Sequence, residues 1–333
     1  MTLIIAEAGV NHNGDMVLAR ELVAIAAEAG ADLVKFQTFS AEKIAAASAP
    51  KATYQIETTG STESQREMIA RLELSHEDHA MLAEECAARG IGFFSTGFDP
   101  ASIDLLVGMG VDRVKIPSGE LINRTLLEHA AAKRLPIILS TGMAELSEIA
   151  EAVELLCANG VERSEVTVLH CNTQYPTPMA DVNLRAMLTM SAALGTPYGY
   201  SDHTNGTEIP IAAVALGATV IEKHFTISRD LPGPDHRASL EPDELRAMVA
   251  SVRNVEAALS GDGVKRPSPS ERANRAIARP SIVARIPIRA GELFTAQNLT
   301  VKRPGTGISP MRLPEVIGRI AMRDYGIDEA IGT

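Results

Sequence analysis

Short β-branched segments alternate with Ala-rich amphipathic segments from residue 3 to about residue 260, and this alternation constrains the fold more than any other feature. The expected strands are Leu3–Ala8, Leu33–Thr38, Gly92–Thr96, Arg113–Pro117, Pro136–Ser140, Val166–Cys171, Tyr198–Asp202 and Val220–Phe225. Helical patterns fill most of the gaps, for example at Val17–Ala29, His76–Arg89, Glu145–Asn159 and Pro242–Ser260. Eight strands that alternate with helices predict an α/β protein with a (β/α)8 barrel. A doubly wound sheet is the alternative, but no GxGxxG motif follows the first strand.

Each expected strand begins apolar and ends with a chemically useful side chain. These residues are Glu7, Lys35, Gln37, Ser95, Thr96, Lys115, Ser118, Ser140, Asn172, Ser201, His203, Glu222 and His224. The carboxyl ends of barrel strands converge on one face, where barrel enzymes carry their active sites. Strand ends are in general more polar than strand middles, but that tendency explains only two or three of these residues. The pattern therefore predicts an active site on this face.

The end of the chain has a different composition from the repeating part. Residues 261–275 (GDGVKRPSPSERANR) are polar and rich in Gly, Pro and Ser, which is typical of a linker. Short strand-like runs and an RAGE turn follow, which predict a small, mostly β domain. We therefore expect a barrel over residues 1–262, a linker over 263–277 and a second domain over 278–333. Residues 52–74 form a long connection, and such loops on the active face are often lids or substrate contacts.

Composition excludes several functions. The chain has 333 residues and a net charge of -11 without a Lys/Arg cluster, so nucleic acid is not an expected partner. No apolar run approaches the ~20 residues that span a bilayer, and the first apolar residues are interpreted as a strand rather than a signal peptide. The three cysteines, Cys86, Cys157 and Cys171, are widely spaced, which favours reduced thiols and a cytoplasmic location.

Two histidines end consecutive strands. His203 and His224 could share one divalent metal, with water and substrate oxygens as the other ligands. The alternative is two separately hydrogen-bonded histidines, and the spacing favours the metal. His236 is a candidate third ligand or an ordinary loop residue, and His12 is expected to hold its loop or to touch substrate.

Two lysines lie inside otherwise apolar strands, in VKFQT and VKIPS. Lys35 and Lys115, together with the hydroxyl groups of Thr96, Ser118 and Ser140, provide what a bound phosphate or carboxylate needs. A solvated lysine is a poor alternative at such positions. A barrel lysine can also form a Schiff base, and this second chemical interpretation stays open.

Three acidic residues are candidates for proton transfer or sugar binding. Glu7 and Glu222 lie inside apolar strands, where a carboxylate must be paired, near a metal or protonated. Glu222 precedes His224 by two residues and could support it or donate a proton. Asp235 follows a Pro-Gly-Pro turn and could contact a sugar hydroxyl. A structural salt bridge is the alternative for each of these acids.

The motifs together resemble the bacterial sialic acid synthase family. They are AEAGVNHNG, VKFQT, STGFD, KIPSGE, LSTGM, HCNTQYPTP, YSDHT, EKHFT and PGPDH, and the end IRAGELFTAQNLTVKRPGTGI resembles the antifreeze-like (SAF) domain of that family. The resemblance implies a (β/α)8 TIM barrel, a C-terminal SAF domain, a domain-swapped homodimer and a divalent metal, manganese or magnesium. It also implies roles for individual residues. Lys35, Thr96, Lys115, Ser118, Ser140 and Ser201 would bind phosphoenolpyruvate, His203 and His224 the metal, Gln37, Tyr175, Asp235 and Arg303 the sugar, and Glu7 and Glu222 would be catalytic.

The implied reaction condenses phosphoenolpyruvate with an N-acylated amino-hexose and water, which gives a sialic-acid-type 2-keto acid and phosphate. The segment CNTQYPTP resembles the branch that makes N,N'-diacetyllegionaminate, and Thr173 stands where some members have asparagine. An N-acetylneuraminate synthase that uses N-acetylmannosamine is the alternative within the family. A Schiff-base aldolase on Lys35 or Lys115 is the alternative from another class. A non-catalytic carbohydrate-binding or ice-binding protein is a further alternative, but it leaves the polar strand ends unexplained.

Overall fold

The computed structural model describes residues 1–332, and the chain divides into two compact units. The first unit is Met1–Ser260, and the second begins at Gly261. Each unit has its own cluster of buried apolar side chains.

Eight parallel strands close into a barrel in the first unit. They are β1 (Leu3–Gly9), β2 (Leu33–Thr38), β3 (Gly92–Gly97), β4 (Val114–Ile116), β5 (Ile137–Ser140), β6 (Val166–His170), β7 (Tyr198–Asp202) and β8 (Val220–His224). The barrel is closed because Glu7 of β1 pairs with Lys35 of β2 on one side and with His224 of β8 on the other. The predicted (β/α)8 fold is confirmed, and every predicted strand agrees with an observed one to within one residue at each end.

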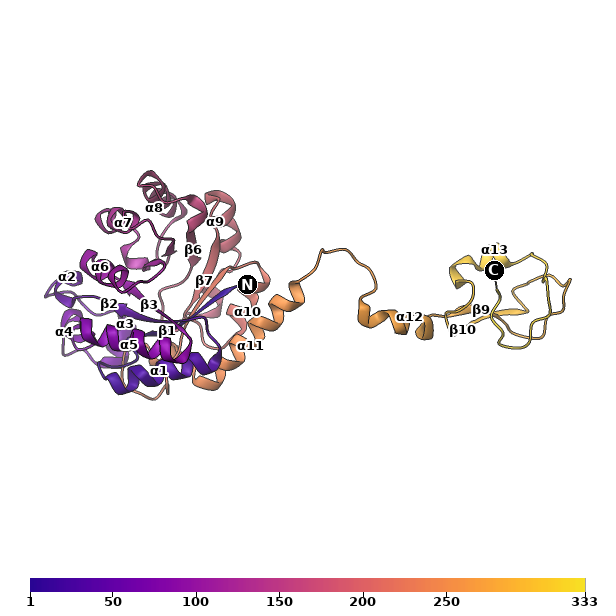
Figure 1. Cartoon of the computed structure of the whole chain (residues 1–333), viewed down its shortest axis with the longest axis horizontal. Helices are drawn as coiled ribbons and strands as arrows, with labels where there is room; N and C mark the ends of the chain where they lie inside the picture. The colour runs from indigo at the N-terminus through magenta and orange to yellow at the C-terminus, as the bar shows by residue number, and fades with distance from the viewer. Residues whose placement is uncertain (333) are drawn as a thin grey trace. The chain divides into compact units, whose positions relative to one another are not determined.

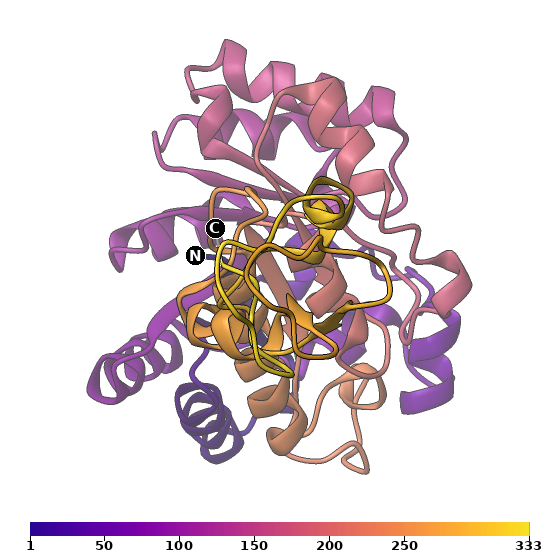
Figure 2. The same ribbon diagram turned by 90° about the vertical axis from the view of Figure 1, so that its right-hand side faces the viewer.

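One main helix follows each strand, and these helices surround the strands in both views of the barrel (Figures 1 and 2). They are α1 (Met16–Ala29), α5 (His76–Arg89), α6 (Pro100–Gly108), α7 (Arg124–Ala131), α8 (Leu146–Ala158), α9 (Ala186–Leu194), α10 (Glu208–Ala215) and α11 (Pro242–Leu259). Local sequence signals set their ends. Asp15 caps α1 by accepting a hydrogen bond from the amide of Val17, and Gly30 ends the helix with φ 79°. Glycine adopts this left-handed conformation without the steric cost of a side chain.

The alternation of side chains along the strands separates two environments. Ile5, Phe94, Ile138, Leu169 and Val220 form one buried apolar cluster, contributed by alternate inward-facing positions of the strands. The residues of opposite parity pack under the helices. This packed layer closes the barrel below the strand ends, so polar side chains two positions further along each strand stand above an apolar floor.

The connection between β2 and α5 contains three short helices, α2 (Ala41–Ile44), α3 (Thr53–Thr59) and α4 (Gln65–Ala70). We call residues 39–74 the β2 insert. A buried lysine holds it together: Lys51 Nζ donates to Thr59 Oγ1 at 2.9 Å and pairs with Glu63 at 3.0 Å, and Arg71 pairs with the same carboxylate. The segment predicted as a long connection is therefore an ordered, helical part of the barrel.

The second unit contains an antiparallel pair of strands, β9 (Ser281–Ala284) and β10 (Leu299–Lys302). Ile282, Ile288, Phe294, Leu299 and Val316 belong to its buried core, and α13 (Leu313–Val316) contributes the last of them. Within the segment predicted as a linker, residues 272–278 form the helix α12 (Arg272–Ala278). The capping box of Ser268 and Glu271 precedes it and explains why a helix begins in so polar a segment. Among residues 1–332, no helix has the length and apolar content that a bilayer crossing needs.

Candidate active site

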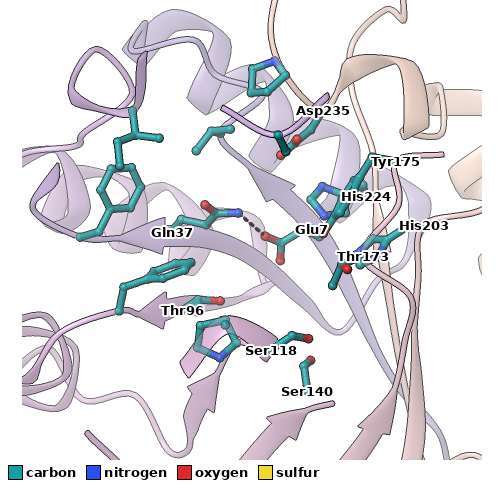
Figure 3. Close-up of a pocket in the computed structure, with 18 of the residues that line it drawn as sticks. Glu7, Gln37, Thr96, Ser118, Ser140, Thr173, Tyr175, His203, His224 and Asp235 are labelled. Carbon is teal, nitrogen blue, oxygen red and sulfur yellow. Dashed lines mark hydrogen bonds between the residues drawn. The ribbon is translucent and has the colours of Figure 1, made fainter. Parts of the chain in front are cut away.

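A cavity of about 580 Å³ opens at the carboxyl ends of the barrel strands. It is lined by Glu7, Lys35, Gln37, Thr96, Lys115, Ser118, Ser140, Tyr175, Ser201, His203, Glu222, His224 and Asp235, which are the predicted site residues of the barrel. Figure 3 shows Glu7 and Gln37 between the hydroxyl side chains of Thr96 and Ser140 on one side and Asp235 on the other. Arg303, the remaining predicted site residue, belongs to the second unit, where it is exposed just after β10.

The two-residue repeat of the strands explains this convergence. Thr96 lies two residues after Phe94 of the apolar floor, and Ser140 lies two residues after Ile138. The same parity places Glu7 above Ile5 and Glu222 above Val220. Residues of the opposite parity do not line the cavity. Lys223 and Asp202, for example, form a fully buried ion pair at 2.6 Å outside the cavity lining.

Lys35 is the centre of a layer of charged side chains that lies above the apolar floor. We call this layer the charged floor of the cavity. Its Nζ lies 2.7 Å from Glu7 Oε2, 2.9 Å from Glu222 Oε2 and 2.8 Å from Thr96 Oγ1. All of these groups are buried. Burial works against the charged lysine, but Glu222 and Glu7 outweigh it and raise the Lys35 pKa above its usual value. The side chain therefore stays cationic and holds two carboxylates from β1 and β8 together.

Lys115 forms a second cationic group on the same floor. Its Nζ donates to Ser140 Oγ at 2.6 Å and lies 3.8 Å from Glu222 Oε1. Ser201 donates to the same Glu222 oxygen at 2.9 Å. Burial lowers the pKa of Lys115, partly against the attraction of Glu222. The two lysines and neighbouring hydroxyls form a compact set of donors suited to an anionic ligand.

Ser118 lies beside this set, next to the loop after β5. Its Oγ accepts a hydrogen bond from the amide of Gly142 at 2.9 Å and lies 3.2 Å from Cys171 Sγ. A Cβ on Gly142 would lie 2.5 Å from Thr173 Cγ2, so this close approach of the backbone requires glycine. The sequence LSTGM therefore places a backbone N–H beside the predicted anion site.

The two carboxylates of the floor are not equivalent. Burial raises the pKa of Glu7, and Lys35 only partly opposes this effect. Burial also acts on Glu222, but Lys115 and Lys35 outweigh it and keep its pKa below the usual value. Glu222 is thus a permanent anion, whereas Glu7 can hold or release a proton near neutral pH. Asp235, at the rim, has a pKa raised to about 7 by burial.

The imidazole rings of His203 and His224 are neighbours in the cavity, with ring centroids 5.3 Å apart. Burial lowers the pKa of His203 to about 4 and that of His224 well below its usual value, so both rings are neutral. His203 Nδ1 bonds to the backbone oxygen of Asn172, which can only accept, so Nε2 of this ring keeps its lone pair. His224 Nδ1 is buried without a hydrogen-bond partner.

Neutral imidazoles with available lone pairs are the donors that a divalent metal requires. The residues therefore fit a metal held by two histidines. Within residues 1–332 no group of three or more His, Cys, Asp or Glu side chains forms a complete protein cage. Water and substrate oxygens would have to supply the remaining positions, which leaves room for a substrate to bind there.

The other two histidines named from the sequence lie apart from the metal candidates. His236 Nδ1 is 2.7 Å from Thr226 Oγ1 and its Nε2 is 3.3 Å from Asn13 Oδ1, so its contacts belong to the loop after β8. His12 Nδ1 accepts from the amide of Gly14 at 3.0 Å. Neither residue lines the cavity. The geometry matches the loop-holding interpretation of both residues.

One aromatic residue of the site was not identified from the sequence. Tyr54 of α3 stacks on Tyr175 with ring centroids 5.0 Å apart, and Tyr175 stacks on His203 at 4.0 Å. The stack joins the β2 insert to the loop after β6, and all three of its residues line the cavity. The only sequence signal was an aromatic residue within the polar segment ATYQIETTG.

The fold and the site together define a barrel enzyme whose cavity holds two buried lysines and two neutral histidines at the strand ends. The chain matches the NeuB family model over residues 22–265 and the SAF domain model over residues 279–332, and it belongs to the NeuB family. The predicted family and the predicted SAF domain are thus confirmed.

Individual relatives show which named enzymes the chain is similar to. The chain is 51% identical to the N,N'-diacetyllegionaminic acid synthase of Campylobacter jejuni over 99% of this chain and 98% of that protein. It is 48% identical to the enzyme of the same name from Legionella pneumophila, over 96% of this chain and 90% of that protein. Among solved structures, the N-acetylneuraminic acid synthetase of Leptospira borgpetersenii is 37% identical with a TM-score of 0.71, covering 82% of this chain and 90% of that one.

Proposed function

We propose that this enzyme condenses phosphoenolpyruvate with an N-acylated amino-hexose and water, releasing phosphate and a nine-carbon 2-keto acid. One observation carries the proposal: a single cavity combines two buried lysines surrounded by hydroxyl groups with two neutral histidines on adjacent strands. The first group suits an anionic donor, and the second suits the carbonyl group of an acceptor.

The lysine side of the cavity would bind phosphoenolpyruvate. Lys35 and Lys115 neutralise its phosphate and carboxylate groups, and the hydroxyl groups of Ser118 and Ser140 supply hydrogen-bond donors beside Lys115, with Ser118 Oγ held by the amide of Gly142. Thr96 and Ser201 complete the set. Glu222 bridges towards both lysines, so it holds their ammonium groups in place when the site is empty.

The reaction makes one carbon–carbon bond. The methylene carbon of phosphoenolpyruvate attacks the aldehyde carbon of the open-chain sugar; the aldehyde oxygen takes up a proton and becomes a hydroxyl group, and positive charge develops at the enol carbon. Water adds to that carbon, and phosphate leaves by cleavage of the carbon–oxygen bond, which exposes the keto group. Glu7 is the group suited to take the proton from this water, because burial brings its pKa into the range where it can exchange protons near neutral pH.

A divalent metal, Mn²⁺ or Mg²⁺, on His203 and His224 would supply Lewis-acid polarisation of the acceptor aldehyde. Tyr175, stacked on His203, fixes the orientation of that ring. Gln37 donates to Glu7 Oε1 at 3.4 Å and lies where it can also reach a sugar hydroxyl. Asp235, at the rim, is suited to a second sugar hydroxyl.

For the acceptor we propose a 2,4-diacetamido-6-deoxy hexose, so that the product is N,N'-diacetyllegionaminate. The two relatives of that name and the presence of Thr173 in the cavity lining support this choice. The alternative, N-acetylmannosamine, is supported by the likeness to the Leptospira borgpetersenii structure, at lower identity.

We also propose that the enzyme works in the cytoplasm as a domain-swapped homodimer in which Arg303 of one subunit contacts the sugar bound to the other. The resemblance in the KRPGTG motif supports this arrangement, together with an exposed Arg303 and a barrel cavity that contains no arginine in its described lining. An acyl-sugar contact from outside the barrel would fill that gap.

Phosphate release tests the proposed function directly. The purified enzyme with Mn²⁺ and phosphoenolpyruvate is assayed against a panel of 2-acetamido and 2,4-diacetamido hexoses. We expect phosphate release with the diacetamido sugar in excess of that with N-acetylmannosamine. A preference for N-acetylmannosamine would overturn the choice of acceptor, and no release with any sugar of the panel would overturn the condensation itself.

A further inference from the structure

The cavity has two chemically different sides. The strand ends supply the charged and hydroxyl groups described above, whereas the β2 insert, together with Val10 after β1 and Phe98 after β3, forms an apolar wall. The wall consists of Val10, Phe39, Ile44, Ala45, Met68, Ile69, Leu72 and Phe98, all of which line the cavity. A sugar that carried only hydroxyl groups would leave this wall without a matching surface.

One face of α4 and the residue two positions beyond it form much of this wall. Gln65, Met68, Ile69 and Leu72 follow the spacing i, i+3, i+4 and i+7, and all four line the cavity. Arg71, between Ala70 and Leu72, does not line the cavity; its exposed side chain pairs with Glu63. The helix therefore turns its apolar side to the cavity in the way that other helices turn theirs to a core.

The wall is packed against a small core of its own, so it is a formed surface. Val10, Phe39 and Leu72 are buried, and Ile44, Ile69 and Phe98 pack against them while remaining partly accessible. Phe39 and Phe98 meet edge to face with ring centroids 5.9 Å apart.

The same insert also carries two carboxamide side chains that line the cavity. Gln65 lies on the cavity face of α4, and Gln55 is held in α3 by the amide of Ala52, which donates to its Oε1 at 3.0 Å. The Gln55 Nε2 group lies 3.4 Å from the hydroxyl of Tyr54. A surface that combines apolar side chains with amide donors and acceptors matches a ligand group with a methyl end and a polar amide.

An acetamido group has this composition. We propose that the wall formed by the β2 insert is the subsite for the acetamido group at C4 of the acceptor sugar, with Ile44 and Ile69 in contact with its methyl group. The proposal rests on the proposed function and adds to it the residues that select the substrate. A hydroxyl at C4 would be desolvated against the same wall with few partners, which explains a preference for the bulkier sugar.

The test uses two acceptors that differ only at C4: the 2,4-diacetamido-6-deoxy hexose and its 4-hydroxy analogue, both with the 2-acetamido group and the 6-deoxy carbon. Ile69→Thr and Ile44→Thr each replace an apolar wall residue from a different helix while keeping the branch at Cβ. Val17→Thr puts a hydroxyl in place of a methyl group on α1, at a side chain that is 72% exposed and outside the cavity, and so controls for the introduction of threonine itself.

We expect each wall variant to lower kcat/KM for the diacetamido sugar by about 10-fold or more, because Ile→Thr removes the terminal methyl group and puts a hydroxyl in the apolar pocket, and one missing methylene alone costs at least that much. For the 4-hydroxy analogue, kcat/KM should change by less than about 3-fold, and Val17→Thr should leave both values unchanged. Thermal unfolding of each variant checks that the fold is intact.

Equal losses for both sugars would overturn the subsite, because a contact with the 2-acetamido group, with C6 or with the fold in general would affect the two acceptors alike. A wild-type enzyme that releases no phosphate with the diacetamido sugar would instead overturn the proposed acceptor, and the subsite with it. The two failures are therefore distinguishable: the first appears in the kcat/KM values of the variants, whereas the second appears as a lack of phosphate release by the wild-type enzyme.

Discussion

Replacing Lys35 by methionine tests the interpretation of the cavity floor most directly. Methionine has nearly the same length but no charge, so Lys35→Met leaves the buried carboxylates of Glu7 and Glu222 without the cation that lies 2.7 Å and 2.9 Å from them. The variant should lose both stability and the ability to bind phosphoenolpyruvate.

The expected loss of stability follows from burial. Glu7 and Glu222 are 2% and 5% exposed, so water replaces little of the lost interaction. Removing one partner of a buried ion pair costs about 3–5 kcal/mol. For a domain of this size, 1 kcal/mol corresponds to roughly 2–4 °C in Tm. The Tm of the barrel should thus fall by about 10 °C at pH 8.

The loss should depend on pH. Without Lys35, the folded-state pKa of at least one carboxyl group rises further above its unfolded value of about 4.3. Such a group contributes stability that is fully present below the unfolded pKa and is lost as the pH rises through the folded pKa. The difference in Tm between wild type and Lys35→Met should therefore be clearly smaller at pH 5 than at pH 8.

Lys223→Met is the matched control. Lys223 is also a fully buried lysine, on the neighbouring side of β8, but it pairs with Asp202 outside the cavity. We expect it to lower Tm by a similar amount while KM for phosphoenolpyruvate stays near the wild-type value. A Lys35→Met enzyme with wild-type Tm at pH 8, or with an unchanged KM for phosphoenolpyruvate, would refute the role given to Lys35.

Three further predictions concern the metal, the mechanism and the dimer. Dialysis against a chelator should abolish phosphate release and Mn²⁺ should restore it; His203→Ala with wild-type metal content and rate would contradict the metal site. Borohydride reduction with pyruvate should leave Lys35 and Lys115 unmodified in mass spectra, whereas a covalent adduct on either lysine would favour the Schiff-base aldolase. Arg303→Ala and Lys115→Ala should each be nearly inactive alone and recover part of the activity when their subunits are mixed, and no recovery after verified exchange would argue against a shared site.

The residues at the strand ends were predictable because two simple sequence signals act together, one in composition and one in periodicity. Short β-branched runs locate the strands, and the two-residue repeat then assigns each polar residue to the inside or the outside. Glu7, Lys35 and Glu222 follow this rule, and so does Lys223, whose parity directs it away from the cavity. The family motifs added the chemical roles, which stay predictions for the individual site residues.

The apolar wall was not predictable in the same way. Its side chains come from separate short helices, and α4 has only six residues, too few for a helical period to stand out from the sequence. Tyr54 stood out only as an aromatic residue in a polar segment, and its role could not be predicted because its partner Tyr175 lies far away in the chain. The roles of His12 and His236 likewise depended on contacts with Gly14, Thr226 and Asn13 that only the fold brings together.

The position of the β2 insert has a consequence for evolution and for engineering. The insert is one continuous stretch between two elements of the barrel, and its internal clamp of Lys51, Glu63 and Arg71 lies entirely within it. The proposed acceptor subsite can therefore be exchanged as a cassette, while the lysines and histidines at the strand ends, to which we assign the chemistry, keep their geometry.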